Sequence, residues 1–240
     1  MDKTIEAVAA PTMTRRRILV GGATAAIVAV AGAGAYYLWS RPSLSQPGPV
    51  VAEPPGGADV PLAELMAPGP LGDNFLGSAD APVTIIEYAS MTCPHCAHFY
   101  ETTYPELKTK YIDTGKVRFI FREFPLDQLA AAASMLARCA GKDKYFPLIE
   151  TFFAQQKEWV VQKPLEPMLA IAKQAGFTQQ SFEECLANQQ MLTALEETRK
   201  RANTKFGVNT TPTYFINGKI IRGGFSAEEL DKQIAPYLKG

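Results

Sequence analysis

The stretch of sequence that decides the fold reads Val83-Thr84-Ile85-Ile86-Glu87-Tyr88-Ala89-Ser90-Met91-Thr92-Cys93-Pro94-His95-Cys96. Its first seven residues are mostly β-branched or aromatic, which predicts a short buried strand. A helical pattern then runs from the cysteines to about residue 112, and residues 116–124 alternate as a second strand. A strand, a helix and a strand within about 40 residues are typical of a βαβ unit with parallel strands.

The segment after residue 124 is predicted to be helical. It holds about 75 residues rich in Ala, Leu, Gln and Glu, with turn signals near Gly141, Pro164 and Gly176. This composition and these breaks predict several short helices in succession.

The C-terminal segment carries a hairpin signal and a helix start. Asn217-Gly218 separates two short apolar runs, 213–216 and 219–222, and an Asn-Gly pair in this setting indicates a β-hairpin. Ser226-Ala227-Glu228-Glu229 has the pattern of a capping box that opens a last helix through residue 238. The expected order is therefore βαβ, a helical block, then ββα, which is an α/β fold.

The composition is that of a folded protein. Of 240 residues, 47% are apolar and 20% are charged, whereas a disordered chain would hold fewer apolar residues. Lys and Arg number 24 and balance 24 Asp and Glu. A neutral chain lacks the basic field on which nucleic-acid binding relies, so we expect no nucleic-acid partner.

The first 40 residues are predicted to be an export signal or a membrane anchor. Residues 18–39 carry no charge and directly follow Arg15-Arg16-Arg17, which resembles a twin-arginine signal and also suits a cytoplasmic N-terminus. A helix of this length would span roughly 33 Å, enough to cross a bilayer. Small residues near Ala33 also offer cleavage points, so a cleaved signal and a membrane tether through 18–39 both remain open.

Residues 41–70 are predicted to be a linker. They contain 8 prolines and 4 glycines with few bulky apolar residues between them. Such a composition favours extended conformations and does not form a packed core, so we interpret the segment as a spacer.

The two closely spaced cysteines carry the predicted chemistry. If Cys93 is the N-cap of the helix, Pro94 falls at its first position, where a missing N–H has no consequence. The Cys93 sulfur then faces the free amides of the first turn, which should lower its pKa from about 8.5. His95 can add a donor or a positive charge, and Cys96 would act as the resolving partner. A stabilised thiolate stabilises the reduced form, so the disulfide becomes an oxidant.

Other uses of these cysteines compete with redox chemistry. A zinc site would need a second pair of ligands, and Cys139 and Cys185 lie far along the chain. Cys93, Cys96 and His98 could together hold a soft metal such as Cu(I). A purely structural disulfide in so tight a turn would be strained and easily reduced. The proline between the cysteines and the strand-to-helix junction favour redox use, with no metal.

These motifs together resemble the DsbA family of thiol:disulfide oxidoreductases in the thioredoxin superfamily. The resemblance covers residues 71–240 and rests on Cys93-Pro94-His95-Cys96 after a strand, a helical insertion, and Thr210-Thr211-Pro212-Thr213 near the end. It implies a thioredoxin fold interrupted by an all-helical insertion at about 127–205. It further implies that Pro212 follows a cis peptide bond beside the active-site sulfur, with Thr211 before it, and that both contact substrate.

The resemblance assigns roles to three more residues. Glu87 matches the position of the family's buried acidic residue, which would exchange a proton with Cys96; otherwise it faces solvent at a sheet end. Some family members join cysteines in the insertion, which implies a structural disulfide between Cys139 and Cys185. The alternative is two buried apolar cysteines. Met91 is assigned no role.

The resemblance also implies function, partners and location. The activity would be the introduction of disulfide bonds into exported proteins, with no cofactor beyond the redox-active disulfide Cys93–Cys96. The partners would be unfolded or reduced exported proteins and a DsbB-type membrane oxidase, in the periplasm of a Gram-negative bacterium. Thr211 also occurs in isomerases and reductases of the superfamily, so that activity is one alternative. A tethered Cu(I)-binding module is another.

Overall fold

The computed structural model describes residues 60–238. The predicted export or anchor segment, 1–40, and most of the predicted linker lie outside these residues. Within the described part, no helix is both long enough and apolar enough to span a bilayer.

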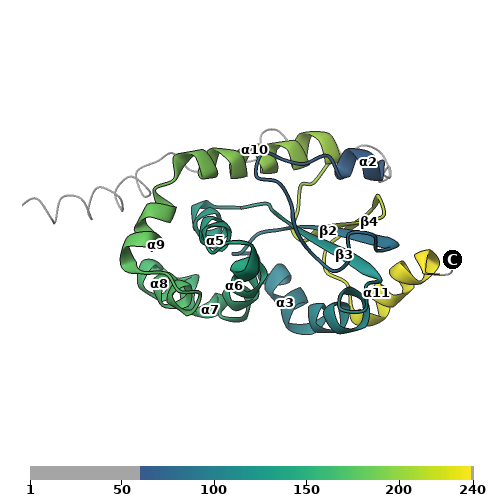
Figure 1. Cartoon of the computed structure of the whole chain (residues 1–240), viewed down its shortest axis with the longest axis horizontal. Coiled ribbons are helices and arrows are strands. Elements are labelled where there is room, and N and C mark those ends of the chain that lie inside the picture. Colours follow the sequence, from purple (N-terminus) through teal and green to yellow (C-terminus); the bar gives the residue numbers. More distant parts are fainter. Residues whose placement is uncertain (1–59, 239–240) are drawn as a thin grey trace, which may run out of the picture. The chain divides into compact units, whose positions relative to one another are not determined.

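The core of the fold is a five-stranded sheet in the order β1-β3-β2-β4-β5. Its strands are β1 (Asn74–Leu76), β2 (Val83–Ala89), β3 (Val117–Glu123), β4 (Thr213–Ile216) and β5 (Lys219–Arg222). β2 and β3 are parallel, as the βαβ pattern predicts, and the other neighbours are antiparallel. Every residue of the central strand β2 is buried, because it has neighbours on both edges and helices on both faces (Figure 1).

The crossover between β2 and β3 is broken into three pieces. They are α3 (Pro94–Thr102), α4 (Tyr104–Leu107) and a π-helical turn at Lys108–Ile112. The sequence pattern predicts one helix here, and the break falls at Thr103, just before Pro105. A proline lacks the N–H that would continue the helical hydrogen bonds, so the helix is interrupted near this point.

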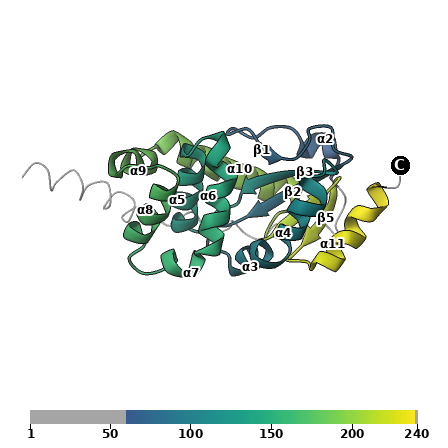
Figure 2. The same ribbon diagram turned by 60° about the horizontal axis from the view of Figure 1, so that its bottom comes forward.

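The helical block lies at one end of the sheet (Figures 1 and 2). It comprises α5 (Gln128–Cys139), α6 (Lys142–Ala154), α7 (Gln156–Trp159), α8 (Leu165–Gln174), α9 (Gln179–Leu186) and α10 (Gln189–Phe206). The predicted fold class, a thioredoxin fold with an all-helical insertion, is confirmed. α10 extends from the block back over one face of the sheet, where Ala202 and Phe206 join the core; α3 lies on the opposite face.

The C-terminal motifs form as predicted. Asn217 and Gly218 both have positive φ, 47° and 95°, and connect β4 to β5. Ser226 and Glu229 make both hydrogen bonds of a capping box at the start of α11 (Ala227–Ile234). A 3₁₀ turn at Ala235–Tyr237 then replaces the end of the predicted helix.

Two elements precede the predicted first strand, and one of them shows that the predicted linker, 41–70, extends too far toward the C-terminus. α2 (Leu62–Leu65) lies inside the predicted spacer 41–70, and Leu65 is completely buried in the core. The Val60 amide also donates to the Gly218 carbonyl at 3.0 Å. Residues 60–70 therefore belong to the folded domain. Pro61 occupies the N-cap of α2, so a helical turn follows this proline directly.

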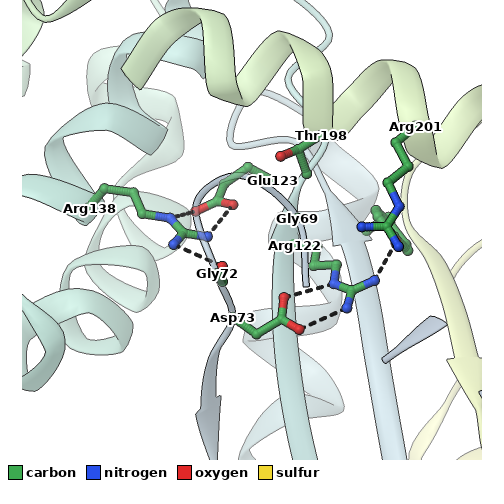
Figure 3. Close-up of a pocket in the computed structure, with 9 residues that line it drawn as sticks. Gly69, Gly72, Asp73, Arg122, Glu123, Arg138, Thr198 and Arg201 are labelled. Carbon is green, nitrogen blue, oxygen red and sulfur yellow. Dashed lines mark hydrogen bonds and ion pairs between the residues drawn. The ribbon is translucent and has the colours of Figure 1, made fainter. Parts of the chain in front are cut away.

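Three arginines fasten segment 64–73 to the domain (Figure 3). Arg122 binds both carboxylate oxygens of Asp73 with N–O distances of 2.9 and 2.8 Å. Arg138 donates to two backbone carbonyls of the segment, at 3.0 and 3.2 Å, and Arg201 donates to another at 2.8 Å. Because these side chains satisfy backbone carbonyls of the segment, it can cross the fold without forming a strand.

Candidate active site

The Cys-Pro-His-Cys motif lies where β2 gives way to α3. Cys93 has the extended conformation of an N-cap, with φ −76° and ψ 119°, and Pro94 is the first residue of the helix. The Cys93 amide donates to the Ser90 carbonyl at 3.0 Å and closes the turn between strand and helix. The predicted capping arrangement is confirmed.

Hydrogen bonds lower the pKa of the Cys93 thiol to about 5. The largest contribution comes from the Cys96 thiol, which donates to the Cys93 sulfur. Burial opposes this effect, and the Thr211 side chain and the backbone amides of Cys96 and His95 add to it. The amides at the helix N-terminus therefore act as the sequence predicts, but the partner cysteine contributes more than they do.

The Cys96 thiol has the opposite electrostatic character. It is completely buried, and this burial raises its pKa well above the ordinary value. The thiolate of Cys93 and the carboxyl of Glu87 raise it further. At neutral pH the reduced pair therefore holds one thiolate, on Cys93, and one thiol, on Cys96.

A cis peptide bond joins Thr211 to Pro212 directly opposite the active-site sulfur. The Cys93 sulfur lies 3.4 Å from the Thr211 carbonyl oxygen, to which it donates when it is protonated, and β4 begins at the next residue after Pro212. The structure thus brings the C-terminal proline motif against the cysteine motif, 118 residues earlier in the chain.

Glu87 is completely buried in the middle of β2. Its two carboxylate oxygens accept hydrogen bonds from the hydroxyls of Tyr100, at 3.3 Å, and Tyr214, at 3.2 Å. Burial raises its pKa to about 8, although both tyrosines favour the charged form. The solvent-facing alternative is therefore wrong.

The two histidines of the motif lie at the surface. His95 contributes its backbone amide to the Cys93 sulfur, whereas its side chain is exposed. His98 is exposed as well. Among residues 60–238, no group of three or more His, Cys, Asp or Glu side chains is placed to hold a metal ion. The role of the His95 imidazole stays a prediction.

A further residue, which the sequence does not reveal, supports the active-site turn. The Gln156 side chain, from α7 of the helical block, donates to the carbonyls of Met91 at 2.8 Å and Cys93 at 3.0 Å. Gln156 belongs to no motif, so only the fold shows that it lies here. Met91 itself is a buried core residue.

A disulfide bond joins Cys139 and Cys185 within the helical block. It links the last residue of α5 to α9, with Cα atoms 6.2 Å apart. Cys93 and Cys96 are both free cysteines, so this pair is in its reduced form.

Residues 71–235 match the thioredoxin family, and the chain belongs to that family. Within the superfamily it is DsbA-like. It is 31% identical to α-DsbA1 of Wolbachia pipientis, whose crystal structure superimposes with a TM-score of 0.68 over 72% of this chain and 94% of that one.

The names of two similar proteins agree with this assignment. The chain is 37% identical over 153 residues to a Rickettsia bellii protein named as a candidate protein-disulfide oxidoreductase, covering 61% of this chain and 57% of that one. It is 28% identical over 177 residues to disulfide bond formation protein D of Bacillus subtilis, covering 70% and 78%. The chain thus spans less than two thirds of the Rickettsia bellii relative.

Proposed function

We propose that the protein is a thiol:disulfide oxidoreductase that introduces disulfide bonds into exported proteins. The observation that carries the proposal is the contrast between the two active-site sulfurs. The pKa of Cys93 is lowered to about 5, while that of Cys96 is raised well above its ordinary value. Stabilising the Cys93 thiolate stabilises the reduced enzyme, and this makes the Cys93–Cys96 disulfide a strong oxidant.

The first step is attack by a substrate thiolate on the Cys93 sulfur of the oxidised enzyme. A new bond forms between substrate and Cys93, and the Cys93–Cys96 bond breaks with its electron pair leaving on Cys96. The buried Cys96 sulfur does not persist as a thiolate, because its pKa is high. Glu87, neutral below its pKa of about 8, supplies the proton.

The second step releases the oxidised substrate. The second substrate thiolate attacks the substrate sulfur of the mixed disulfide, and Cys93 leaves as a thiolate. Two electrons have passed from the substrate dithiol to the enzyme. One of the two substrate protons balances that taken up by Cys96, and the other goes to solvent. The low pKa of Cys93 makes it the better leaving group, so the mixed disulfide resolves toward product.

Substrate recognition is assigned to the loops around Cys93. The backbone at Thr211-Pro212 lies against the sulfur and would pair with an extended substrate chain, which gives breadth without sequence preference. Leu126 and Val160 are exposed apolar side chains, 45% and 39% accessible, in segments that hydrogen-bond to the active-site turn. Apolar surface of this kind suits an unfolded polypeptide.

The partners and the compartment follow from the same chemistry. An oxidant that gives up its disulfide needs a reoxidant, and we assign this role to a DsbB-type membrane oxidase. Free exported thiols are oxidised in the periplasm of a Gram-negative bacterium, where we place this protein. Residues 1–40 would bring it there as a cleaved signal or hold it there as a tether through 18–39.

A disulfide isomerase or reductase is the second candidate, because threonine at position 211 also occurs in isomerases and reductases of the superfamily. The Thr211 side chain is one of the groups that lower the Cys93 pKa, and this contribution by itself favours the oxidase. The copper-binding alternative has no such support within the described residues.

A titration in glutathione redox buffers, paired with refolding assays, tests the proposal. An oxidase is expected to equilibrate at an oxidising potential and to form disulfides in reduced ribonuclease. Preferential reactivation of scrambled ribonuclease, together with a reduction potential as low as that of ordinary dithiols, would favour the isomerase or reductase.

A further inference from the structure

The proposed function leaves one proton without a described path. Glu87 and Cys96 are each completely buried, yet the proton that Glu87 gives to Cys96 must be replaced from solvent in every cycle. A bound substrate covers Cys93 during this step. The replacement must therefore come from another side of the carboxyl group.

Two tyrosine hydroxyls contact the Glu87 carboxylate, and their surroundings differ. Tyr214 packs against the rings of Phe99 and Phe225, with centroids 5.1 and 4.5 Å away, and is completely buried. Tyr100 also stacks between two rings, those of Tyr104 and Phe153, with centroids 4.5 and 4.4 Å away, but it is 7% exposed and borders a cleft of about 330 Å³. The two hydrogen bonds to Glu87 are nearly equal in length, 3.2 and 3.3 Å, but of the two tyrosines only Tyr100 borders the cleft.

The cleft lies between α3 and α4 on one side and the end of α6 on the other. Exposed residues such as Ala154 form part of its wall. The Tyr104 ring stacks on the Tyr100 ring with centroids 4.5 Å apart, and its hydroxyl donates to Glu150 at 2.7 Å. The cleft therefore brings an acidic side chain and solvent close to the residue that contacts Glu87.

We propose that Tyr100 and this cleft form the route by which Glu87 exchanges protons with solvent, an inference that rests on the proposed function. In reprotonation, the Tyr100 hydroxyl passes its proton to the Glu87 carboxylate and takes another from water in the cleft. Only O–H bonds change, and the tyrosine is neutral before and after. During reoxidation the same steps run in reverse and discharge the proton of Cys96.

The electrostatics agree with a hydroxyl relay. Burial raises the pKa of Tyr100 well above its ordinary value, so a phenolate does not accumulate. The titratable groups that face Glu87 are Tyr100 and the two cysteines from the α3 side and Tyr214 from β4; its partner on β3 is Phe121. None of the other groups offers a second path to the surface, since each is either enclosed or covered by substrate.

The test follows protonation of Glu87 directly in the reduced full-length protein. Rapid mixing takes the pH from above to below the Glu87 pKa of about 8, and infrared absorption records the carbonyl stretch of the neutral carboxyl group. Cys93 stays a thiolate and Cys96 a thiol across this range, so neither interferes. Glu87→Gln removes the band and assigns it.

Tyr100→Phe and Tyr214→Phe form a matched pair, because each removes one hydroxyl from the same carboxylate. We expect protonation to slow by about tenfold or more in Tyr100→Phe, less than the roughly 100-fold effect of losing a positioned proton-transfer group, since local opening still admits water. Tyr214→Phe should keep the wild-type rate. Equal rates in the two variants would overturn the proposal.

A second variant blocks the cleft and leaves both hydroxyls in place. Ala154→Phe should slow protonation as Tyr100→Phe does, whereas Ala170→Phe, at an exposed position on α8, should not. A wild-type rate in Ala154→Phe would also refute the route. If the wild-type band does not titrate near pH 8 at all, the proton-donor role of Glu87 in the proposed function fails instead.

Discussion

Reduction of the Cys93–Cys96 bond should stabilise the protein by an amount that depends on pH. Only the reduced form carries the Cys93 thiol, whose pKa falls from 9.0 to about 5 on folding. A lowered pKa contributes stability that is complete above pH 9 and is lost as the pH falls through 5. Glu87 titrates in both redox forms, so its effect largely cancels in the difference.

The magnitude follows from the size of the shift. Each pKa unit corresponds to about 1.4 kcal/mol, so a shift of about 4 units amounts to about 5 kcal/mol above pH 9. At pH 7 the contribution is about 3 kcal/mol, since about two units separate that pH from the folded-state pKa. Between pH 5 and 9 the difference in unfolding free energy should rise by about 1.4 kcal/mol per unit.

Urea unfolding of oxidised and reduced protein across this pH range measures the effect. Mass spectrometry must confirm that Cys139–Cys185 stays bonded in both samples. In a Cys93→Ser variant, which cannot form the active-site bond, the rise of unfolding free energy with pH should be smaller by the same slope. If the difference in unfolding free energy between the two redox forms does not change with pH, the reasoning is refuted.

Four other predictions follow from the site. Cys93→Ser should abolish thiol–disulfide exchange, whereas Cys96→Ser should accumulate mixed disulfides visible on non-reducing gels; equal behaviour would contradict the roles assigned. Glu87→Gln should slow substrate oxidation below pH 8, where Glu87 is neutral, and should raise stability above pH 8, where the wild type holds a buried carboxylate. The unfolding free energy of the Glu87→Gln variant should therefore decline less than that of the wild type as the pH rises from 4.5 to 8, which urea unfolding would show. Cys139→Ala should cost about 4 kcal/mol of stability, the chain-entropy value for its loop, without changing the reduction potential; an unchanged midpoint of unfolding would argue against the bond. His95→Ala keeps the backbone amide that contacts the Cys93 sulfur, so the role predicted for the imidazole from the sequence requires this variant to raise the Cys93 pKa; an unchanged thiolate titration would show that the imidazole has no part in it.

The parts of the fold that the sequence predicts are those with strong local signals. The β-branched run of β2, the Asn217-Gly218 turn and the Ser226 capping box each depend on neighbouring residues only. The Cys93 N-cap is another such signal, since Pro94 favours the first position of a helix. These patterns gave the order of the elements and the active-site turn.

The parts that the sequence does not predict depend on distant contacts. β1 has three residues, too few to show a period, and exists because it pairs with β3. In α2 only Leu65 is buried, and it is buried because the core offers it a place. The tyrosines around Glu87 and the Gln156 contact likewise join segments far apart in the chain. No local pattern carries such information.

The central claim is that the Cys93 sulfur is ionised at neutral pH. The rate at which iodoacetamide alkylates Cys93, measured against pH in the reduced protein, reports the thiolate fraction of that one sulfur. The structure predicts a midpoint near pH 5. A midpoint near 8.5, the value of an unperturbed cysteine, would contradict it.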